Sequence, residues 1–362
     1  MLLNSKYIIT PAAVLNNNYI ITQVKQMSTS ISLIPDTYAG EKFKKTINLL
    51  LNSAGFKSYF VPSILDRPIE KGCWAINLND HLANITESDW RRKNFRLVLH
   101  AQDFCHYYNN SLCTELHFIE QQLTPEQQMK TIFVHWDHGL SDLYIGNIKC
   151  VEFASHSYEL VHALHTHWDR WKEVHNKDIK YNFICLNGWL RKHRIELYEI
   201  LKDIPTGFTT HINHNPAPMH PYCNYNFNNV ENFVKLMPLY QQAKASIVSE
   251  TIYADHPGII TEKTLLAIAA KHPFMCIGHQ GIHREIAERG FENFNELFDL
   301  SYDTLASEHR LDAAMDLNLY NLSDSEWDVV CAQEKTERNF DFLMNGYTKS
   351  IEQRFLTRLK NC

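Results

Sequence analysis

The fold is decided by the run ASIVSE (residues 245–250) and, after a loop, the run ITEKTLLAIA (260–269). The first run predicts a short buried strand, and the second predicts the beginning of a helix. A helix start presents unpaired N–H groups and the positive end of its dipole, so it suits a phosphate, and Lys263 adds a mobile positive charge there. The carboxylate of Glu250 or Glu262 can accept hydrogen bonds from sugar or ribose hydroxyls. Together these residues favour a nucleotide-sugar site; the alternative is a strand-to-helix turn whose charges are merely solvated.

A second helix start carries the same kind of charge. A predicted strand ends in the Asn187-Gly188 turn, and the helix expected over 190–202 then opens with basic residues. Each cation at an exposed helix N-terminus is unfavourable by about 0.3–1 kcal/mol, and a bound anion would reverse that penalty. The glycine turn lets backbone N–H groups approach such an anion, and Arg191 or Arg194 could hold a diphosphate bidentately. A diphosphate would fit between the two helix starts; the alternative is a basic surface helix.

Strand and helix signals alternate along most of the chain, which predicts an α/β fold with mostly parallel sheets. The 362 residues are long for one domain, so two domains are expected, with a boundary at the polar stretch 176–178. We expect an N-terminal acceptor-side domain (1–176), a C-terminal nucleotide-sugar-binding domain (177–322) and terminal helices (323–362) that pack back on the first domain. The Pro-, Asn- and His-rich stretch 205–229 is expected to form a loop.

Composition narrows the class of protein. The net charge of −6 indicates neither nucleic-acid nor membrane binding overall, although Arg91, Arg92, Lys93 and Arg96 could form a local phosphate-contacting patch. The nine cysteines are scattered without a C-x-x-C pair, which predicts a reduced, cytoplasmic protein. Apolar runs are too short to span a membrane, and a signal peptide is not expected. Neither G-x-G-x-x-G after a strand nor G-x-x-x-x-G-K-[ST] occurs, so a dinucleotide oxidoreductase and a P-loop NTPase are disfavoured.

Two regions resemble known glycosyltransferases. Residues 183–188, with the basic helix start after them, resemble the first strand-loop-helix of the nucleotide-binding half of GT-B glycosyltransferases. Residues 249–251, 260–264 and 272–278 are similar to the signature of the α-1,3-fucosyltransferase-like family, and closer still to glycosyltransferase-like proteins of bacteriophages. The resemblance covers roughly residues 181–300, and the N-terminal half resembles no family that we can name.

The resemblance implies two Rossmann-like domains that face a cleft, with a C-terminal helix crossing back to the first domain. It implies a metal-independent enzyme that uses a UDP- or GDP-sugar and no cofactor, in keeping with the absence of a D-x-D motif. Inversion of the anomeric configuration is the preferred expectation, and retention stays open. In that family the Glu and Lys of the T-E-K motif contact the ribose and phosphates, and an Arg of the earlier helix contacts the diphosphate. The expected donor-binding residues are Asn187, Gly188, Arg191, Arg194, Glu250, Thr261, Glu262 and Lys263.

An inverting glycosyltransferase needs a general base to take the proton of the acceptor hydroxyl, and this base normally comes from the N-terminal domain. Parallel sheets place ligands beyond the carboxyl ends of their strands, and the predicted strand 131–134 is followed by Asp137 and His138. We therefore expect Asp137, or else His138, to be the catalytic base. The alternative is a loop that only packs Trp136 into the core.

The acceptor stays open at this point. The likeness to bacteriophage proteins favours a hydroxymethylated pyrimidine in DNA, with the protein acting in the host cytoplasm, and a glycan is the competing acceptor. Departures from the family pattern over 205–229 and 253–259 leave the sugar open as well. An alternative of another class is a protein of the same fold that binds a nucleotide sugar without turnover.

Overall fold

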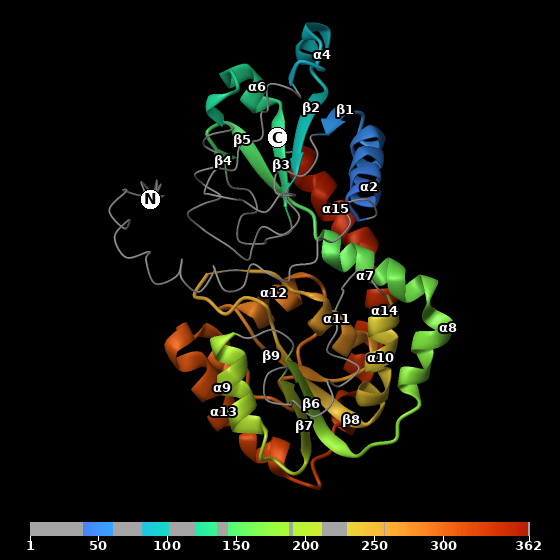
Figure 1. Ribbon diagram of the computed structural model, residues 1–362, viewed down its shortest axis with the longest axis vertical. Coiled ribbons are helices and arrows are strands. Elements are labelled where there is room, and N and C mark those ends of the chain that lie inside the picture. Colours follow the sequence, from blue (N-terminus) through green and yellow to red (C-terminus); the bar gives the residue numbers. More distant parts are fainter. Residues whose placement is uncertain are drawn as a thin grey trace, which may run out of the picture. The chain divides into compact units, whose positions relative to one another are not determined.

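The computed structural model describes residues 39–60, 82–100, 120–135, 144–187, 191–211, 230–256 and 258–360. Residues 40–362 form one compact unit that contains two β-sheets with helices beside them (Figure 1). Parallel pairing dominates both sheets, so the predicted α/β class with mostly parallel sheets is confirmed.

The first sheet has the strand order β1-β2-β3-β5-β4, and only the β4–β5 pair is antiparallel. Its strands are β1 (Lys57–Phe60), β2 (Phe95–His100), β3 (Thr131–His135), β4 (Tyr144–Ile145) and β5 (Ile148–Glu152). The helices of this part are α2 (Ala39–Ser53), α4 (Glu87–Arg91), α6 (Pro125–Met129) and α7 (Ser155–Thr166). Every residue of β3 and β5 is buried, as expected for parallel strands covered on both faces.

The second sheet has the strand order β7-β6-β8-β9, and all of its pairs are parallel. Its strands are β6 (Tyr181–Asn187), β7 (Gly207–His211), β8 (Ala243–Ser249) and β9 (Phe274–Ile277). Its helices are α9 (Lys192–Leu201), α10 (Val230–Gln241), α11 (Glu262–Ala269), α12 (Ile282–Glu288) and α13 (Ser307–Ser323). The strand and helix predicted from residues 245–269 are therefore present as β8 and α11. In Figure 1, α9 and α13 lie on one side of this sheet and α10 on the other.

Strand β7 corrects the expectation of a loop over 205–229, of which residues 212–229 lie outside the described residues. Its backbone pairs with β6 in register, and Thr209 Oγ1 donates to the carbonyl of Cys185 at 3.1 Å. A Cβ at Gly207 would come within 2.1 Å of the Phe183 ring, so the close approach of the two strands requires glycine. The Pro-, Asn- and His-rich sequence around this strand gave no strand signal. The strand is stabilised by its pairing with β6, which a local sequence pattern does not record.

The strand order reverses between β6 and β8. From β6 the chain adds β7 on one side of β6, and then returns to add β8 and β9 on the other side. Such a reversal opens a crevice at the carboxyl ends of the two strands, where ligands bind in open α/β sheets. Among the described strands of the first sheet, the order shows no comparable reversal.

The two sheets share one apolar core. The largest buried cluster includes Val134 of β3 and Phe274 of β9. Two terminal helices, α14 (Gln333–Asn345) and α15 (Tyr347–Lys360), extend this core, because α14 contacts α11 and α15 contacts β5 and α7. Helix α15 buries one stripe of side chains at four-residue spacing, Tyr347, Ile351, Phe355 and Leu359. The domain boundaries 1–176, 177–322 and 323–362 and the GT-B arrangement stay predictions.

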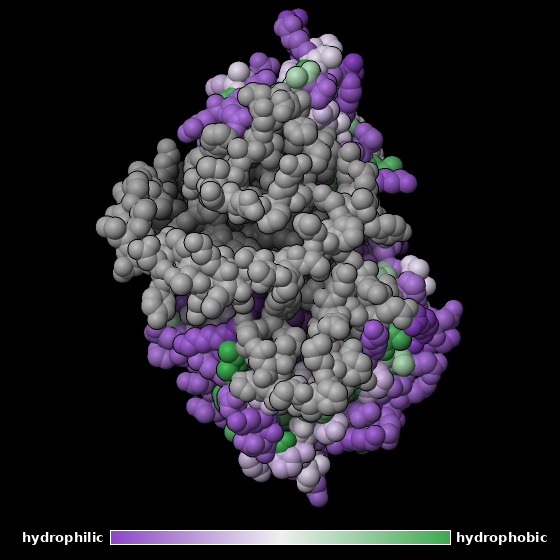
Figure 2. Space-filling view, viewed as in Figure 1, coloured by the Kyte–Doolittle hydropathy of each residue, from purple (hydrophilic) through white to green (hydrophobic). Residues whose placement is uncertain are grey.

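On the described part of the surface in Figure 2, most residues are hydrophilic, with isolated apolar ones between them. The segment between α7 and β6 contains two short helices, α8 (Trp168–Trp171) and η3 (Lys172–His175). Within the described ranges, no helix combines the length and the hydropathy that a membrane-spanning segment needs.

Candidate functional site

The candidate site lies at the carboxyl ends of β6 and β8, where the strand order reverses. Ile184 pairs with Ser246, and the same register continued by three residues places Asn187 beside Ser249. These are the last residues of their strands, and Glu250 follows directly. All three are buried. Because parallel strands end at the same edge of a sheet, their polar groups gather there.

Glu250 joins β8 to the start of α11. Its carboxylate accepts hydrogen bonds from the backbone N–H of Thr261 (3.0 Å), from Thr261 Oγ1 (2.6 Å) and from Thr264 Oγ1 (2.6 Å). Thr261 is itself the N-cap of α11, and Glu250 is 0% exposed. A buried carboxylate with several donors at a helix N-terminus is strongly stabilised. Glu250 therefore holds the loop and the helix together through these hydrogen bonds, and its expected role in binding a ribose or sugar stays a prediction.

Side chains at the start of α9 also contact Glu250. Arg194 is only 2% exposed, and its Nη2 donates to the carbonyls of Ser249 (3.2 Å) and Glu250 (3.1 Å). His193 Nε2 also donates to the Glu250 carbonyl at 3.1 Å, and its ring stacks on Tyr253 with 4.9 Å between centroids. The two helix starts thus converge on Glu250, α9 through its carbonyl and α11 through its carboxylate. Because His193 and Arg194 are buried, the alternative of a solvated basic surface helix does not hold for them.

Burial and neighbouring cations shift the protonation of these groups. Burial, with a smaller effect of Arg191, lowers the pKa of Arg194 to about 10, so Arg194 is a cation at neutral pH. Burial, followed by the charge of Arg194, lowers the pKa of His193 to about 3, so its imidazole is neutral. Arg191 and Lys263 also lower the pKa of His193. Cations from the starts of both α9 and α11 therefore lower the pKa of the same side chain, His193.

Lys263 is the one basic residue of α11, and it is only partly buried. Its Nζ donates to Thr251 Oγ1 (3.1 Å), Thr261 Oγ1 (2.9 Å) and Glu262 Oε1 (2.9 Å), and its side chain is 21% exposed. Arg191 is half-buried and is the N-cap residue of α9, with an extended backbone. Helix α9 therefore begins at Lys192, two residues later than expected. Both side chains are long enough to turn toward an anion at the helix starts without leaving their backbone positions.

Several buried polar atoms at this edge have no hydrogen-bond partner among the described residues. They are Asn187 Oδ1, Arg194 Nε and Ser249 Oγ at the ends of β6 and β8, and His279 Nδ1 just beyond β9. Leaving a buried donor or acceptor unpaired costs about 1–3 kcal/mol, so native proteins rarely leave several together. The edge is therefore suited to a polar ligand. Sequence reasoning did not select Ser249 or His279, although the rule that ligands bind beyond strand ends could have pointed to both.

The expected catalytic bases, Asp137 and His138, lie outside the described residues, as does Gly188. His135, the last residue of β3, is buried and stacks on Phe133 at 5.6 Å between centroids. The described residues contain no group of three or more His, Cys, Asp or Glu side chains that could hold a metal ion.

The suggested phosphate-contacting patch is not a free cationic surface. Arg91 pairs with Glu87, and Arg92 lies 3.6 Å from Asp89, so acids alternate with these bases. Arg96 is buried, with its guanidinium 4.5 Å from the centroid of the Phe56 ring. The interpretation of Arg96 as a phosphate contact is therefore wrong.

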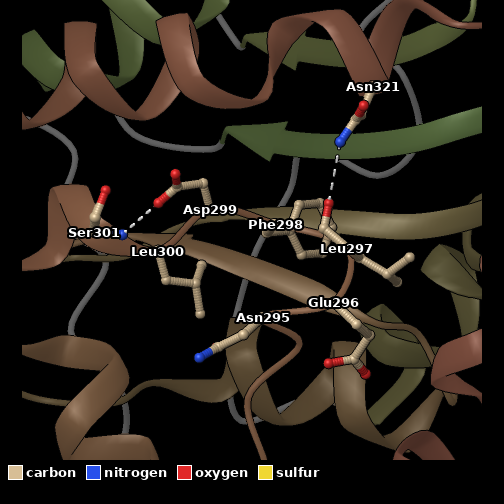
Figure 3. Close-up of a pocket in the computed structure, with 8 residues that line it drawn as sticks. All are labelled: Asn295, Glu296, Leu297, Phe298, Asp299, Leu300, Ser301 and Asn321. Carbon is tan, nitrogen blue, oxygen red and sulfur yellow. Dashed lines mark hydrogen bonds between the residues drawn. The ribbon is translucent and has the colours of Figure 1, made fainter.

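A pocket of about 560 Å³ lies elsewhere, between residues 295–301 and Asn321 (Figure 3). Next to Asn321, the Leu322 carbonyl accepts a hydrogen bond from Asn182 near the start of β6, away from the strand ends described above. The lining contains Glu296 and Asp299 but no cation, so it does not suit a diphosphate.

No family model, no curated protein and no solved structure matches this chain. The function of the protein therefore has to be inferred from the geometry at the ends of β6 and β8.

Proposed function

We propose that this protein is a glycosyltransferase that binds a nucleotide sugar at the carboxyl ends of β6 and β8. The observation that carries this proposal is the convergence of two helix starts on Glu250 at the reversal of strand order. Backbone N–H groups, helix dipoles and nearby cations attract phosphates at such a point. The unpaired atoms of Asn187 and Ser249 supply further polar contacts.

The expected division of work follows from burial. Lys263 and Arg191, which are only partly buried, neutralise the diphosphate. Glu262 is buried beside Lys263, and its role of accepting hydrogen bonds from ribose hydroxyls rests on the family resemblance. Arg194 donates hydrogen bonds to the carbonyls of Ser249 and Glu250, so it contributes positive charge to the site without contacting the diphosphate itself. Positive charge fixed around a leaving diphosphate stabilises the transition state of glycosyl transfer without reorganisation.

The acceptor side of the proposal depends on the first sheet. Asp137, or else His138, takes the proton of the acceptor hydroxyl. A hydroxymethylated pyrimidine in DNA is the preferred acceptor and a glycan is the alternative. Incubation with a donor and hydroxymethylcytosine DNA, followed by mass spectrometry of the nucleosides, decides between them, since an unchanged nucleoside mass excludes that acceptor.

Donor binding is tested first, by thermal unfolding with UDP-, GDP- and CMP-sugars and by titration calorimetry with the donor that stabilises the protein. We expect Lys263→Met to weaken donor binding by about 10- to 100-fold, because one charge-assisted hydrogen bond contributes about 1.5–3 kcal/mol. Lys349→Met, at an exposed position of α15, serves as the matched control and should leave the affinity unchanged. Equal affinity of both variants and the wild type would rule out this site. Binding without hydrolysis or transfer would instead indicate a non-catalytic nucleotide-sugar-binding protein.

A further inference from the structure

His279 lies at the same sheet edge as Ser249, two residues beyond the end of β9. Strand β9 pairs with β8 so that Ile277 lies beside Ser249, and the backbone N–H of Glu250 donates to the Ile277 carbonyl at 2.8 Å. A Cβ at Gly278 would be 3.1 Å from the Cβ of Glu250, so the chain stays close to Glu250 as it leaves the strand. His279 follows directly and is only 1% exposed. Its side chain therefore belongs to the polar edge at which the donor is proposed to bind.

Glu285 fixes the orientation of the His279 imidazole. Its Oε2 lies 2.9 Å from His279 Nε2, while its Oε1 accepts hydrogen bonds from Nε and Nη2 of Arg289. An ionised carboxylate only accepts hydrogen bonds, so Nε2 carries a proton. Arg289 already offsets the charge of Glu285, and burial disfavours a second cation beside this pair, so the imidazole is neutral. Nδ1 therefore holds a lone pair and acts as an acceptor.

The lone pair of His279 Nδ1 faces the loop between β8 and α11. Nδ1 is buried and has no hydrogen-bond partner among the described residues. A Cβ at Gly258 would lie 3.0 Å from Nδ1 and 3.2 Å from the Cβ of Ile252, so a side chain at position 258 would cover this atom. A buried acceptor without a donor is unfavourable, so a ligand that supplies an O–H or N–H group is bound favourably here.

The loop that borders His279 also borders the proposed diphosphate contact. Thr251 begins this loop, and its Oγ1 accepts a hydrogen bond from Lys263 Nζ at 3.1 Å. Farther along, the Ala254 carbonyl accepts a hydrogen bond at 2.8 Å from the backbone N–H of Gln280, the residue after His279. The imidazole and the Lys263 ammonium are thus held against one short segment of chain. One ligand at this edge can contact both.

The two groups suit different parts of such a ligand. The Lys263 ammonium attracts the negative oxygens of a diphosphate. The diphosphate of a nucleotide sugar has no hydrogen to donate at neutral pH, so it does not satisfy the His279 acceptor. The hydroxyl groups of the sugar and of the ribose do donate.

We infer that His279 is a donor-binding residue whose Nδ1 accepts a hydrogen bond from a hydroxyl of the nucleotide sugar, and that Glu285 is the positioning residue for its imidazole. This inference rests on the proposed function, because the nucleotide sugar supplies the hydroxyl. Glu285 acts only through His279, since its carboxylate faces Nε2 and Arg289.

Two substitutions separate the two nitrogens of the ring. His279→Gln keeps an N–H donor for Glu285 but removes the acceptor at the position of Nδ1. It should retain the stability of the wild type in urea and bind the nucleotide sugar about 3- to 10-fold more weakly, the contribution of one neutral hydrogen bond. His279→Asn is shorter, so it keeps a polar atom near the position of Nδ1 but loses Glu285. It should be less stable than His279→Gln and bind the nucleotide sugar more tightly.

Titration calorimetry at pH 8 measures these affinities, with the nucleotide sugar that stabilises the wild type and with its nucleoside diphosphate. His309→Gln, at an exposed position of α13, is the matched control and should leave both affinity and stability unchanged. A weaker binding of the nucleoside diphosphate by His279→Gln assigns the hydroxyl to the ribose. A loss confined to the nucleotide sugar assigns it to the sugar. The deoxy analogue at the assigned position should bind more weakly to the wild type but equally to His279→Gln.

Nitrogen NMR of protein labelled with ¹⁵N-histidine tests the tautomer without any variant. In the free protein, His279 should carry its proton on Nε2, and the Nδ1 resonance should move when the nucleotide sugar binds. A proton on Nδ1 in the free protein, or an Nδ1 resonance that does not move on binding, would overturn the inference.

The outcome for Lys263→Met separates this inference from the proposed function. If Lys263→Met weakens binding of the nucleotide sugar and His279→Gln does not, the inference is wrong and the proposed function stands. If His279→Gln and His279→Asn lose stability and affinity together, His279 is only structural. If the wild type binds no nucleotide sugar, the proposed function fails and the inference fails with it.

Discussion

The strand ends of the two sheets use their polar groups differently. At the end of β5, Glu152 is buried and forms ion pairs with Arg289 (2.8 Å) and with Arg358 (2.5 Å). Arg289 also pairs with Glu285, which in turn accepts a hydrogen bond from His279 Nε2 at 2.9 Å. At the ends of β6 and β8, Asn187 and Ser249 leave buried polar atoms without partners among the described residues. Polar groups that are fully paired hold the chain together, whereas unpaired ones at a reversal of strand order suit a ligand.

The largest effect is expected where pairing is most complete. Glu152→Ala leaves the buried Arg289 and the half-buried Arg358 with too few carboxylates, so we expect a loss of about 3–5 kcal/mol in the free energy of unfolding. Urea titration measures this loss, with the exposed Glu326→Ala as a control that should change stability by less than about 0.5 kcal/mol. A loss below about 1 kcal/mol for Glu152→Ala would show that these ion pairs are not structural.

Glu250 combines the two cases, since it lies at the edge proposed to bind the donor but its carboxylate is fully hydrogen-bonded within the protein. Glu250→Ala removes the acceptor for Thr261 and Thr264 at the start of α11, and we expect a loss of about 2–4 kcal/mol. Glu250→Gln keeps one carbonyl acceptor and should lose less than the alanine variant. If both variants unfold like the wild type but no longer bind a donor, Glu250 is a ligand contact after all.

The smallest effect on stability is expected where a polar atom has no partner. Ser249→Ala removes an unpaired buried hydroxyl, so its free energy of unfolding should stay within about 0.5 kcal/mol of the wild type or rise slightly. Its donor affinity should fall by about 3- to 10-fold, the contribution of one neutral hydrogen bond. Calorimetry measures the donor affinity and urea titration measures the free energy of unfolding.

Ser246→Ala is the matched control on the same strand. Its hydroxyl is bonded to His272 Nδ1 at 2.9 Å, so this variant should lose stability and keep its donor affinity. If Ser249→Ala instead behaves like Ser246→Ala, the difference between paired and unpaired strand ends has no functional meaning.

Local sequence patterns were sufficient for the elements of the site. The apolar run 245–249 and the Thr261 start of α11 depend on neighbouring residues alone, because burial periodicity and helix capping are local properties. The basic start of α9 was found for the same reason. Strand β7 was missed, because its stability comes from pairing with β6.

What the sequence determined by itself was an α/β chain with two basic helix starts after strands. Only the tertiary structure decided that β6 lies beside β8, that Glu250 turns inward to receive both helix starts, and that Arg194 is buried beneath the edge. The physical reason is that the pairing of distant strands and the burial of a charge depend on contacts between residues far apart in the chain, which no local pattern records.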